Sequence, residues 1–375
     1  MAESMTGTFE KEGNGRGYLR SPDADYRIRR GDVFVPRDVA QALHLRGGED
    51  VTATPSGSAS KGQSRSLRVD DVTAINDLPV DDYMETKPFE DLTPIDPDEA
   101  IRFETADGPL EMRVVDLMTP IGLGQRGLIV APPRTGKTIL LQQMAAGVAA
   151  NYPDLYMMVL LIDERPEEVT EMRRTVHGEV VASSNDRDIA SHVRIARLMI
   201  EKAKRLVESG RDVFILLDSL TRLGRAFNAA TPGGGRVMSG GLDIRALAEP
   251  KSIFGAARNV EHGGSLTIIA SCLVDTGSRM DEVIFNEFKG TGNMEIMLCR
   301  EMANRRLWPA IDLNLSGTRK EERLLTPEAL EVSHQIRRRL VGSSPVRSME
   351  LLLDALKKQP DNAGFVKAFA ERALR

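Results

Sequence analysis

Cysteine and long apolar runs are what this sequence has least of. Its 375 residues include two cysteines, and neither belongs to a CxxC pair or stands near a histidine cluster. We therefore expect Cys272 and Cys299 to be buried thiols rather than parts of a disulfide or metal site. No apolar run approaches the roughly 20 residues that a membrane-spanning helix needs. The polar N-terminus lacks the apolar core of a signal peptide, so we expect a cytoplasmic protein without a membrane segment.

An excess of charge of one sign is also missing. The 50 Lys and Arg residues nearly balance the 55 Asp and Glu residues, which leaves a net charge of −5. Bulk charge therefore gives no case for nucleic-acid binding, and any such site must be a local patch. The hydrophobic share of 41% and the charged share of 28% are ordinary for a globular chain. The length allows two or three domains, each with its own core.

The sequence does contain a strand, a tight loop and a helix around residues 127–138, GLIVAPPRTGKT. Gly136 lets the backbone wrap closely around an anion, and the following helix turns its N–H groups and positive dipole end towards it. Lys137 supplies a charge for the β- and γ-phosphates, and the Thr138 hydroxyl can ligate Mg²⁺. Because Ala131 replaces the usual first glycine of this motif, an ordinary strand-to-helix turn is the alternative.

Two further apolar stretches end in carboxylates. Residues 157–162 lead into Asp163 and Glu164, and residues 212–218 end in Asp218. The carboxyl ends of parallel strands meet at the edge where α/β sheets bind ligands. We therefore expect Glu164 to orient or deprotonate an attacking water and Asp218 to bond the Mg²⁺ shell. The alternative, that Asp163 and Glu164 cap the next helix, accounts for only one of them. With the phosphate loop, these strand ends indicate a Mg²⁺-dependent ATPase.

Residues 1–75 have the pattern of a small β-barrel. Short strand-like stretches alternate with turns rich in Gly, Pro, Asp and Ser. Glycines flank Tyr18 and Arg20, which suits an oligonucleotide-binding face where aromatics stack on bases and arginines contact phosphates. The alternative is that Tyr18 and Phe34 belong to the barrel core.

The rest of the chain divides in two. Residues 76–100 are acidic and proline-rich, which predicts an extended linker. Residues 101–375 alternate strands and helices, which predicts an α/β domain with a mainly parallel sheet and helices at its C-terminal end. Within it, the glycine-rich loops 230–243 and 274–279 each carry one arginine, which suits gripping of a threaded nucleic-acid strand. Plain surface loops are the alternative.

Two single residues near the end of the domain also have two interpretations. Trp308, the sole tryptophan, could stack on an adenine or fill the core. Arg319 lies in a Ser-Gly-Thr-Arg-Lys loop far in sequence from the phosphate loop. An arginine finger would stand this far away, but so would a solvated loop arginine.

Together these segments resemble one family, the bacterial transcription terminator Rho, a hexameric RNA-dependent ATPase with a RecA-type fold. The similar stretches run in order over nearly the whole chain from about residue 6: QRGLIVAPPRTGKT, VLLIDERPEEVTEM, GEVVAS, ILLDSLTRL, FGAARNVE, GGSLTIIA, FKGTGNME and SGTRKEE. The resemblance implies an oligonucleotide-binding or cold-shock-like barrel followed by a RecA-type P-loop ATPase domain with C-terminal helices.

In function, the resemblance implies an ATP-driven RNA translocase or helicase that terminates transcription. It would act as a homohexamer on nascent single-stranded RNA, with RNA polymerase and elongation factors as partners. A rotary or secretion-type ATPase subunit is the enzymatic alternative, because it too joins a small barrel to such a core. A nucleic-acid-binding protein with a decayed nucleotide site is the non-enzymatic one, although Lys137, Glu164 and Asp218 are all present.

The resemblance also implies roles for individual residues. Thr138 and Asp218 would hold Mg²⁺, with Glu164 as catalytic carboxylate supported by Arg165. ATP would be bound by Pro133, Arg134, Thr135, Gly136, Lys137, Thr138 and Ile139. Arg319 would be the arginine finger, with Arg306 and Lys289 near the subunit boundary and Trp308 stacked on adenine. RNA would be bound in the barrel by Arg16, Tyr18, Arg20 and Phe34, and in the central loops by Arg236, Val237, Ser239, Thr276 and Arg279.

Three features depart from the family pattern. Arg134 stands where a lysine is common, which keeps the charge. Arg16 stands where an aromatic is expected, which weakens the predicted stacking platform. The chain also has little of the helical segment that often precedes the barrel, so we expect a smaller basic contribution there.

Overall fold

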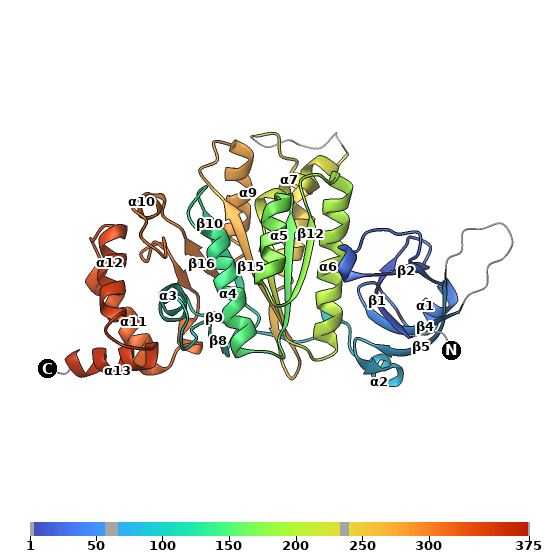
Figure 1. Ribbon diagram of the computed structural model, residues 1–375, viewed down its shortest axis with the longest axis horizontal. Helices are drawn as coiled ribbons and strands as arrows, with labels where there is room; N and C mark the ends of the chain where they lie inside the picture. The colour runs from blue at the N-terminus through green and yellow to red at the C-terminus, as the bar shows by residue number, and fades with distance from the viewer. Residues whose placement is uncertain (1–3, 57–66, 233–239, 374–375) are drawn as a thin grey trace.

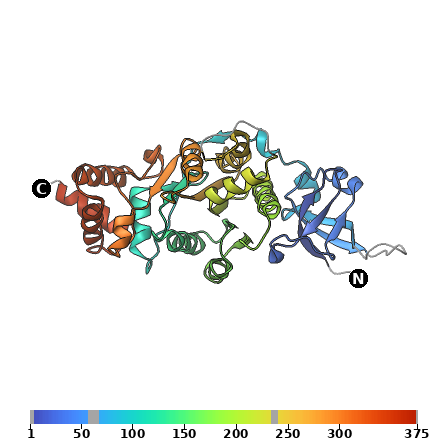
Figure 2. The same cartoon turned by 90° about the horizontal axis from the view of Figure 1, so that it is seen from above.

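The computed structural model describes residues 4–56, 67–232 and 240–373. The chain forms a row of three parts, with an N-terminal barrel, a central sheet layered by helices and a C-terminal helical group (Figure 1). Figure 2 shows the same row from above, with the two termini at opposite ends. The predicted fold class, a small barrel followed by an α/β domain and C-terminal helices, is confirmed.

The barrel closes through a pairing between β3 and β5. The strand order of its sheet is β3-β2-β1-β4-β5-β6, and Phe34 of β3 also pairs with Arg68 of β5. Alternate residues such as Phe9, Leu19 and Val51 fill its interior, as the two-residue period of strands requires. Its elements are β1 (Met5–Lys11), β2 (Gly17–Arg20), η1 (Pro22–Ala24), β3 (Val33–Val35), α1 (Arg37–Ala42), β4 (Asp50–Ser56) and β5 (Arg68–Ile75).

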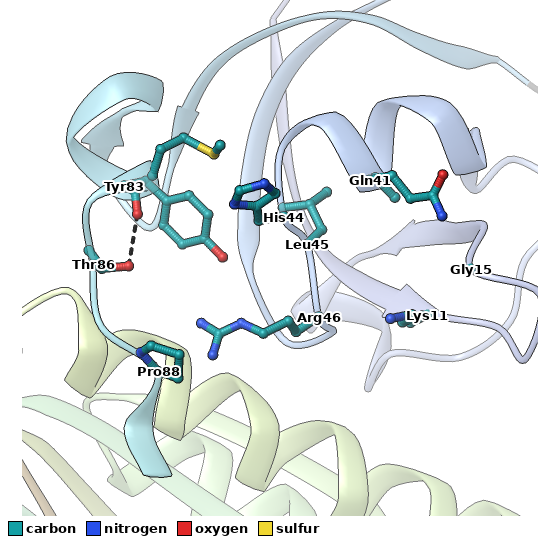
Figure 3. Close-up of a pocket in the computed structure, with 11 residues that line it drawn as sticks. Lys11, Gly15, Gln41, His44, Leu45, Arg46, Tyr83, Thr86 and Pro88 are labelled. Carbon is teal, nitrogen blue, oxygen red and sulfur yellow. Dashed lines mark hydrogen bonds between the residues drawn. The ribbon is translucent and has the colours of Figure 1, made fainter. Parts of the chain in front are cut away.

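The segment after the barrel is not the extended linker that its composition suggested. Tyr83 is 3% exposed and Phe89 1%, so these two aromatics anchor the segment although Asp81 and Asp82 remain exposed. Beside Tyr83 lies a hollow of about 460 Å³ between the barrel and this segment, with His44 and Arg46 on its wall (Figure 3). The elements here are β6 (Leu78–Pro79), α2 (Val80–Met84), η2 (Phe89–Asp91) and β7 (Pro94–Ile95).

The central sheet has the strand order β12-β11-β13-β15-β10-β16 with all neighbours parallel. Its strands are nearly continuous apolar runs because helices cover both faces. They are β10 (Arg126–Ala131), β11 (Tyr156–Ile162), β12 (Glu179–Ser183), β13 (Val213–Asp218), β15 (Ser265–Leu273) and β16 (Met294–Met297). At the edges, β17 (Gly317–Thr318) pairs antiparallel with β16, and β14 (Arg258–Val260) connects β15 to β7.

One apolar cluster lies on each face of the sheet. One joins α3, α4 and α5 to the C-terminal helices α11 and α12, and the other joins α6, α7, α8 and α9. The longer helices are α3 (Leu110–Met118), α4 (Lys137–Asn151), α5 (Pro166–Thr175), α6 (Ile189–Glu208), α7 (Leu220–Ala230), α8 (Ala248–Gly255), α9 (Arg279–Lys289), α11 (Pro327–Leu340), α12 (Pro345–Leu356) and α13 (Asn362–Ala373). Shorter elements are β8 (Ala100–Ile101), β9 (Ile121–Gly122), η3 (Ile244–Leu247), α10 (Arg300–Asn304) and η4 (Glu321–Arg323).

Helix α6 of the α/β domain contacts the barrel. Its outer face is basic, but part of that face is buried rather than solvated. Lys202 is 2% exposed, and its ammonium lies 3.0 Å from Asp50 of the barrel and 2.7 Å from Glu179 of β12. Arg194 pairs with Glu10 at 2.6 Å, and Glu208 accepts a bidentate pair from Arg46. These contacts fix the barrel on the flank of the sheet (Figure 1).

None of the described helices is both long enough and apolar enough to cross a membrane. Neither cysteine forms a disulfide; Cys272 is buried and Cys299 partly so.

Candidate functional site

The loop between β10 and α4 is shaped for an anion. Arg134 and Gly136 have positive φ angles of 60° and 82°, so the backbone curls before α4 begins at Lys137 and directs its first N–H groups into the curl. The Thr135 hydroxyl donates to Pro132 O at 2.7 Å, and Arg300 donates to Pro133 O. The sequence analysis had not singled out Arg300, which fixes the loop from α10.

Gly136 has a second constraint besides its φ angle. A Cβ at this position would lie 2.7 Å from the ring of Trp308, so the indole packs directly against the loop. Trp308 is partly buried, packs against the core cluster and also lies at the phosphate loop. Its position fits both predicted roles, core packing and stacking on adenine.

The two acidic strand ends come together beside Lys137. Because β11 and β13 are parallel neighbours, Glu164 and Asp218 leave the same edge of the sheet. The Lys137 ammonium lies 2.6 Å from Asp218 Oδ2 and 3.6 Å from Glu164 Oε1. Ser271 on the next strand, β15, donates to Asp218 Oδ1 at 2.6 Å. Lys137, the predicted phosphate-binding cation, is thus held between two buried carboxylates.

Glu164 has the environment of a general base. It is 2% exposed, and burial together with the Asp218 charge raises its pKa to about 7, against the opposing effect of Lys137 and Arg222. Its Oε1 has no hydrogen-bond partner among the described residues, although Arg222 Nε lies 3.1 Å away. A carboxylate with a pKa near neutrality and one unbonded oxygen is suited to accept a proton from water.

The helix-capping alternative for Asp163 and Glu164 is wrong. Helix α5 begins at Pro166, its N-cap residue is the exposed Arg165, and no side chain caps it. Asp163 has a positive φ of 56°, and its carbonyl and carboxylate both accept from Arg222. The sequence analysis also missed Arg222. Its position four residues after Asp218, in the first turn of α7, was the signal that could have shown it.

The residues present fit a divalent ion that arrives with a nucleotide. Within the described ranges, no group of three or more His, Cys, Asp or Glu residues could hold a metal by itself. Asp218 and the partly exposed Thr138 supply two oxygens, and the unbonded Glu164 Oε1 lies at the same edge. Mg²⁺ typically takes one or two carboxylates and completes its octahedron with phosphates and waters.

A mostly apolar cavity of about 220 Å³ continues from the loop. Thr135 and Gly136 line one end, Trp308 packs on Gly136, and Ile139 contributes a side chain that is 57% exposed. The volume is below the 300–1,000 Å³ common for whole ligands, and it suits one flat ring system. Arg306, exposed and with a φ of 59°, lies just before Trp308 in the chain, and Lys289 is exposed at the end of α9.

Arg319 lies at the opposite edge of the sheet from this loop. Its N–H donates to Asn293 O, and Thr318 pairs with Met294 at the start of β16. Met294 in turn pairs in register with Gly127 near the start of β10. The length of β10, roughly 16 Å at about 3.3 Å per residue, therefore separates the exposed Arg319 from its own phosphate loop.

On the barrel, Tyr18 and Phe34 form a half-buried aromatic pair with centroids 5.6 Å apart. The Arg16 guanidinium lies 6.0 Å from the Phe34 centroid, so Arg16 shares their face. Arg20 differs from our expectation of an accessible cation, because it is 3% exposed and paired with Glu10 and Asp32 beside the Tyr18 ring. Its charge is already compensated, so a contact with phosphate would require these carboxylates to release it.

Of the central-loop residues, Arg236, Val237 and Ser239 lie outside the described residues. Thr276 donates to the buried Asp281 at 2.6 Å, and Arg279 is exposed at the start of α9. A Cβ on Gly240 would come within 2.7 Å of Met280 N, so the end of the first loop lies against the base of the second. Helix α7 connects these loops to the sheet edge that carries Glu164 and Asp218. Arg225 of α7 pairs with Asp281 at 2.6 Å, and Arg222 of the same helix contacts Glu164.

Comparison with known proteins gives consistent results. Residues 111–318 match the family described as ATP synthase alpha/beta family, nucleotide-binding domain. The chain is 49% identical to transcription termination factor Rho of Cereibacter sphaeroides over 96% of this chain and 85% of the relative. It is 49% identical to that of Salmonella typhimurium over 96% and 86%. The Micrococcus luteus protein is longer: at 47% identity, the match covers 96% of this chain and 52% of the relative.

Among solved structures, the chain is similar to the assembled ATPase EscN from the enteropathogenic E. coli type III secretion system. The TM-score is 0.58 at 18% identity, covering 94% of this chain and 87% of that one. An ATP synthase subunit from Nanoarchaeum equitans gives a TM-score of 0.57 at 16% identity, covering 66% and 62%. At such identities the likeness shows a shared fold.

Proposed function

The chain belongs to the family of transcription termination factor Rho and is an ATP-dependent termination factor, and on that premise we propose how its residues perform this work. It binds nascent single-stranded RNA through the barrel, hydrolyses ATP as a homohexamer in the cytoplasm and moves along the RNA towards RNA polymerase. The observation that carries the proposal is the convergence of Lys137, Glu164 and Asp218 at one sheet edge.

The hydrolytic step follows from the charges at that edge. An incoming triphosphate offers Lys137 stronger partners than the carboxylates it now contacts, so Lys137 moves to the β- and γ-phosphates and releases Asp218. Asp218 and Thr138 would hold Mg²⁺, which when bound would neutralise charge on the phosphates. Glu164, positioned by Arg222, accepts the proton of the attacking water. Arg134 and Arg165, both exposed beside the site, add positive charge around the phosphates.

A ring is needed to complete this site. Because the length of β10 separates Arg319 from its own phosphate loop, its guanidinium serves the nucleotide of a neighbouring subunit. Arg306 and Lys289 lie near that boundary. An arginine finger that works in trans makes hydrolysis depend on assembly.

RNA is held at two places. The Tyr18–Phe34 pair with Arg16 stacks bases and attracts the backbone. Arg20, which is paired with Glu10 and Asp32, lies beside the Tyr18 ring. The central loops, with Arg236, Val237, Ser239, Thr276 and Arg279, grip the threaded strand and move with the nucleotide state through α7.

The test is ATP hydrolysis by the purified protein with and without single-stranded RNA, followed by release of a transcript from a stalled polymerase. We expect RNA to stimulate hydrolysis and ATP to be required for release. A hydrolysis rate that RNA does not change would favour the alternative function, a secretion-type ATPase, which is supported by a distant likeness of fold.

A further inference from the structure

A group of arginines with little acidic compensation lies at the sheet edge where β10 and β15 begin. A hollow of about 460 Å³ there is lined by Arg126 of β10, Arg258 of β14 and Arg323. Asp96 is the one carboxylate on its wall, and it lies 2.6 Å from the Lys320 ammonium and 3.7 Å from Arg323. Within the described residues Arg126 and Arg258 form no ion pair, and their guanidinium groups donate to backbone carbonyls.

Arg319 belongs to the same group. Its N–H donates to Asn293 O, and Asn293 N–H donates to Arg126 O, both at 2.9 Å. Burial lowers the pKa of Arg126, and the charges of Arg258 and Arg319 lower it further. Like charges gathered in this way are unfavourable. The arginine cluster, which we define as Arg126, Arg258, Arg319 and Arg323, therefore needs more negative charge than one shared carboxylate supplies.

Helix α5 carries the opposite imbalance. Glu167 and Glu171 are both exposed and lie one turn apart, a spacing at which like charges disfavour each other. Within the described part of the chain neither forms an ion pair, although Gln142 donates to Glu171 at 3.3 Å. The helix dipole favours Glu167 in the first turn, but Glu171 lies beyond that turn. This face of α5 is therefore suited to contact a group of cations.

The proposed ring brings the two surfaces together. Helix α5 begins at Pro166, two residues after Glu164, so it starts at the nucleotide site. An Arg319 that serves the nucleotide of a neighbouring copy must approach that site from outside. The rest of the arginine cluster then comes alongside α5 of that copy. A ring requires a contact of this kind, between two different surfaces of the same chain.

We infer that the arginine cluster of one copy binds Glu167 and Glu171 on α5 of the neighbouring copy. The contact positions Arg319 for the nucleotide and makes subunit association depend on charge. RNA phosphates are the other polyanion available, but the loop 274–279 follows the end of β15, at the opposite edge of the sheet from the cluster. The inference rests on the proposed ring and names the surfaces that build it.

The experiment measures the mass of the assembled full-length chain as a function of protein concentration, without RNA and without turnover. One variant, Arg258→Glu with Arg323→Glu, reverses the charge of the cluster. A second variant, Glu167→Arg with Glu171→Arg, reverses the charge of α5. Each variant alone should weaken association about tenfold or more, because like charges then meet across the contact.

Mixing the two reversed chains is the decisive step. In a ring where they alternate, every contact joins either two reversed surfaces or two parent surfaces, so assembly should return to the parent level. A variant that failed to fold would not be rescued in this way. Arg338→Glu with Arg347→Glu is the matched control, since it changes the charge by the same amount at exposed positions of α11 and α12 and should assemble like the parent.

Three results would overturn the inference. The first is unchanged assembly of both reversed chains, and the second is weak assembly that does not recover on mixing. The third is an intact ring in which the reversed cluster has lost binding of inorganic phosphate or single-stranded RNA, which would make the cluster a site for those anions. A parent with RNA-stimulated hydrolysis would keep the proposed function in all three cases. A parent that stays monomeric would overturn both the ring and this contact.

Discussion

At the scale of single residues, the site is a buried set of alternating charges. Lys137 and Arg222 stand against Glu164 and Asp218, and both carboxylates are 2% exposed. Such a set is stable only while each charge has its partner. Small changes here should therefore alter both chemistry and stability.

Glu164 should make activity depend on pH near neutrality. Since its pKa is raised from 4.5 to about 7, kcat/KM should fall about tenfold per unit below pH 7 and level off above it. Glu164→Gln should bind ATP but lose turnover at every pH. A pH series of initial rates tests this, and a flat parent profile would exclude Glu164 as the base.

The same shift makes a prediction about stability. The folded protein keeps a proton on Glu164 that the unfolded chain releases between pH 4.5 and about 7. The stability gained from that proton is therefore present below pH 4.5 and is lost as pH rises through about 7. The permanently neutral Glu164→Gln should accordingly exceed the parent in unfolding free energy at pH 8 more than at pH 5. Urea titrations without nucleotide measure the difference, and a pH-independent difference would contradict it.

Gly136 is a second residue with a specific expectation. Ala at this position meets both a positive φ of 82° and the Trp308 ring 2.7 Å away. Gly136→Ala should displace Trp308, shift its fluorescence and weaken ATP binding by tenfold or more. Gly210→Ala is the control, because it has a similar φ of 83° with open space around it. Normal ATP affinity in Gly136→Ala would show that the indole does not depend on this contact.

At the scale of elements, α6 determines how the barrel sits on the sheet. Lys202 lies between Asp50 and Glu179, and burial opposes its charge while these carboxylates hold its pKa above the ordinary value. Lys202→Met would leave both carboxylates without their cation. We expect a loss of about 3–5 kcal/mol in unfolding free energy, read from denaturant titration.

Lys204 is the matched control on the same helix. Its partners Glu90 and Glu201 are solvent-accessible, so Lys204→Met should cost about 1 kcal/mol or less. Equal effects of the two substitutions would mean that the buried network adds nothing beyond an ordinary surface pair.

The barrel face is the other element with its own prediction. Arg16 lies over Phe34 at a position where the resemblance predicts an aromatic, so binding of single-stranded RNA should rest partly on charge. Arg16→Phe should flatten the slope of log affinity against log salt by roughly one phosphate contact. Tyr18→Ala should weaken binding at every salt concentration, since stacking contributes about 1–3 kcal/mol per base. Arg347→Phe, on an exposed site of α12, is the control, and identical slopes for parent and Arg16→Phe would place Arg16 outside the RNA path.

At the scale of the whole molecule, the placement of Arg319 predicts complementation between inactive subunits. Lys137→Ala removes the phosphate charge from its own site, whereas Arg319→Ala removes the finger from a neighbour's. Mixed rings then contain sites that combine an intact Lys137 with an intact Arg319. We expect RNA-stimulated hydrolysis to reappear on mixing, although each variant alone loses on the order of 10³-fold. No recovery on mixing would contradict action in trans.

The sequence by itself determined the order of parts and the chemistry of the nucleotide site. Local patterns were enough to predict the site, because the strand, the tight loop and the helix N-terminus are contiguous in GLIVAPPRTGKT. The acidic residues at the ends of parallel strands must also lie at one edge of the sheet. The barrel followed from short strand-like stretches separated by turns rich in Gly, Pro, Asp and Ser. The acidic composition of residues 76–100, however, hid the anchoring roles of Tyr83 and Phe89, since burial of an isolated aromatic leaves no periodic signal.

Only the tertiary structure decided which side chains meet across distant segments. Packing between elements far apart in the chain places Arg222 on Glu164, Lys202 between Asp50 and Glu179, and Trp308 against Gly136. It also buried Arg20, which its sequence neighbours had suggested was accessible. The physical reason is that hydrogen bonds and ion pairs are short-range and directional, so a residue's type gives its capacity to bond, whereas the fold alone selects its partner.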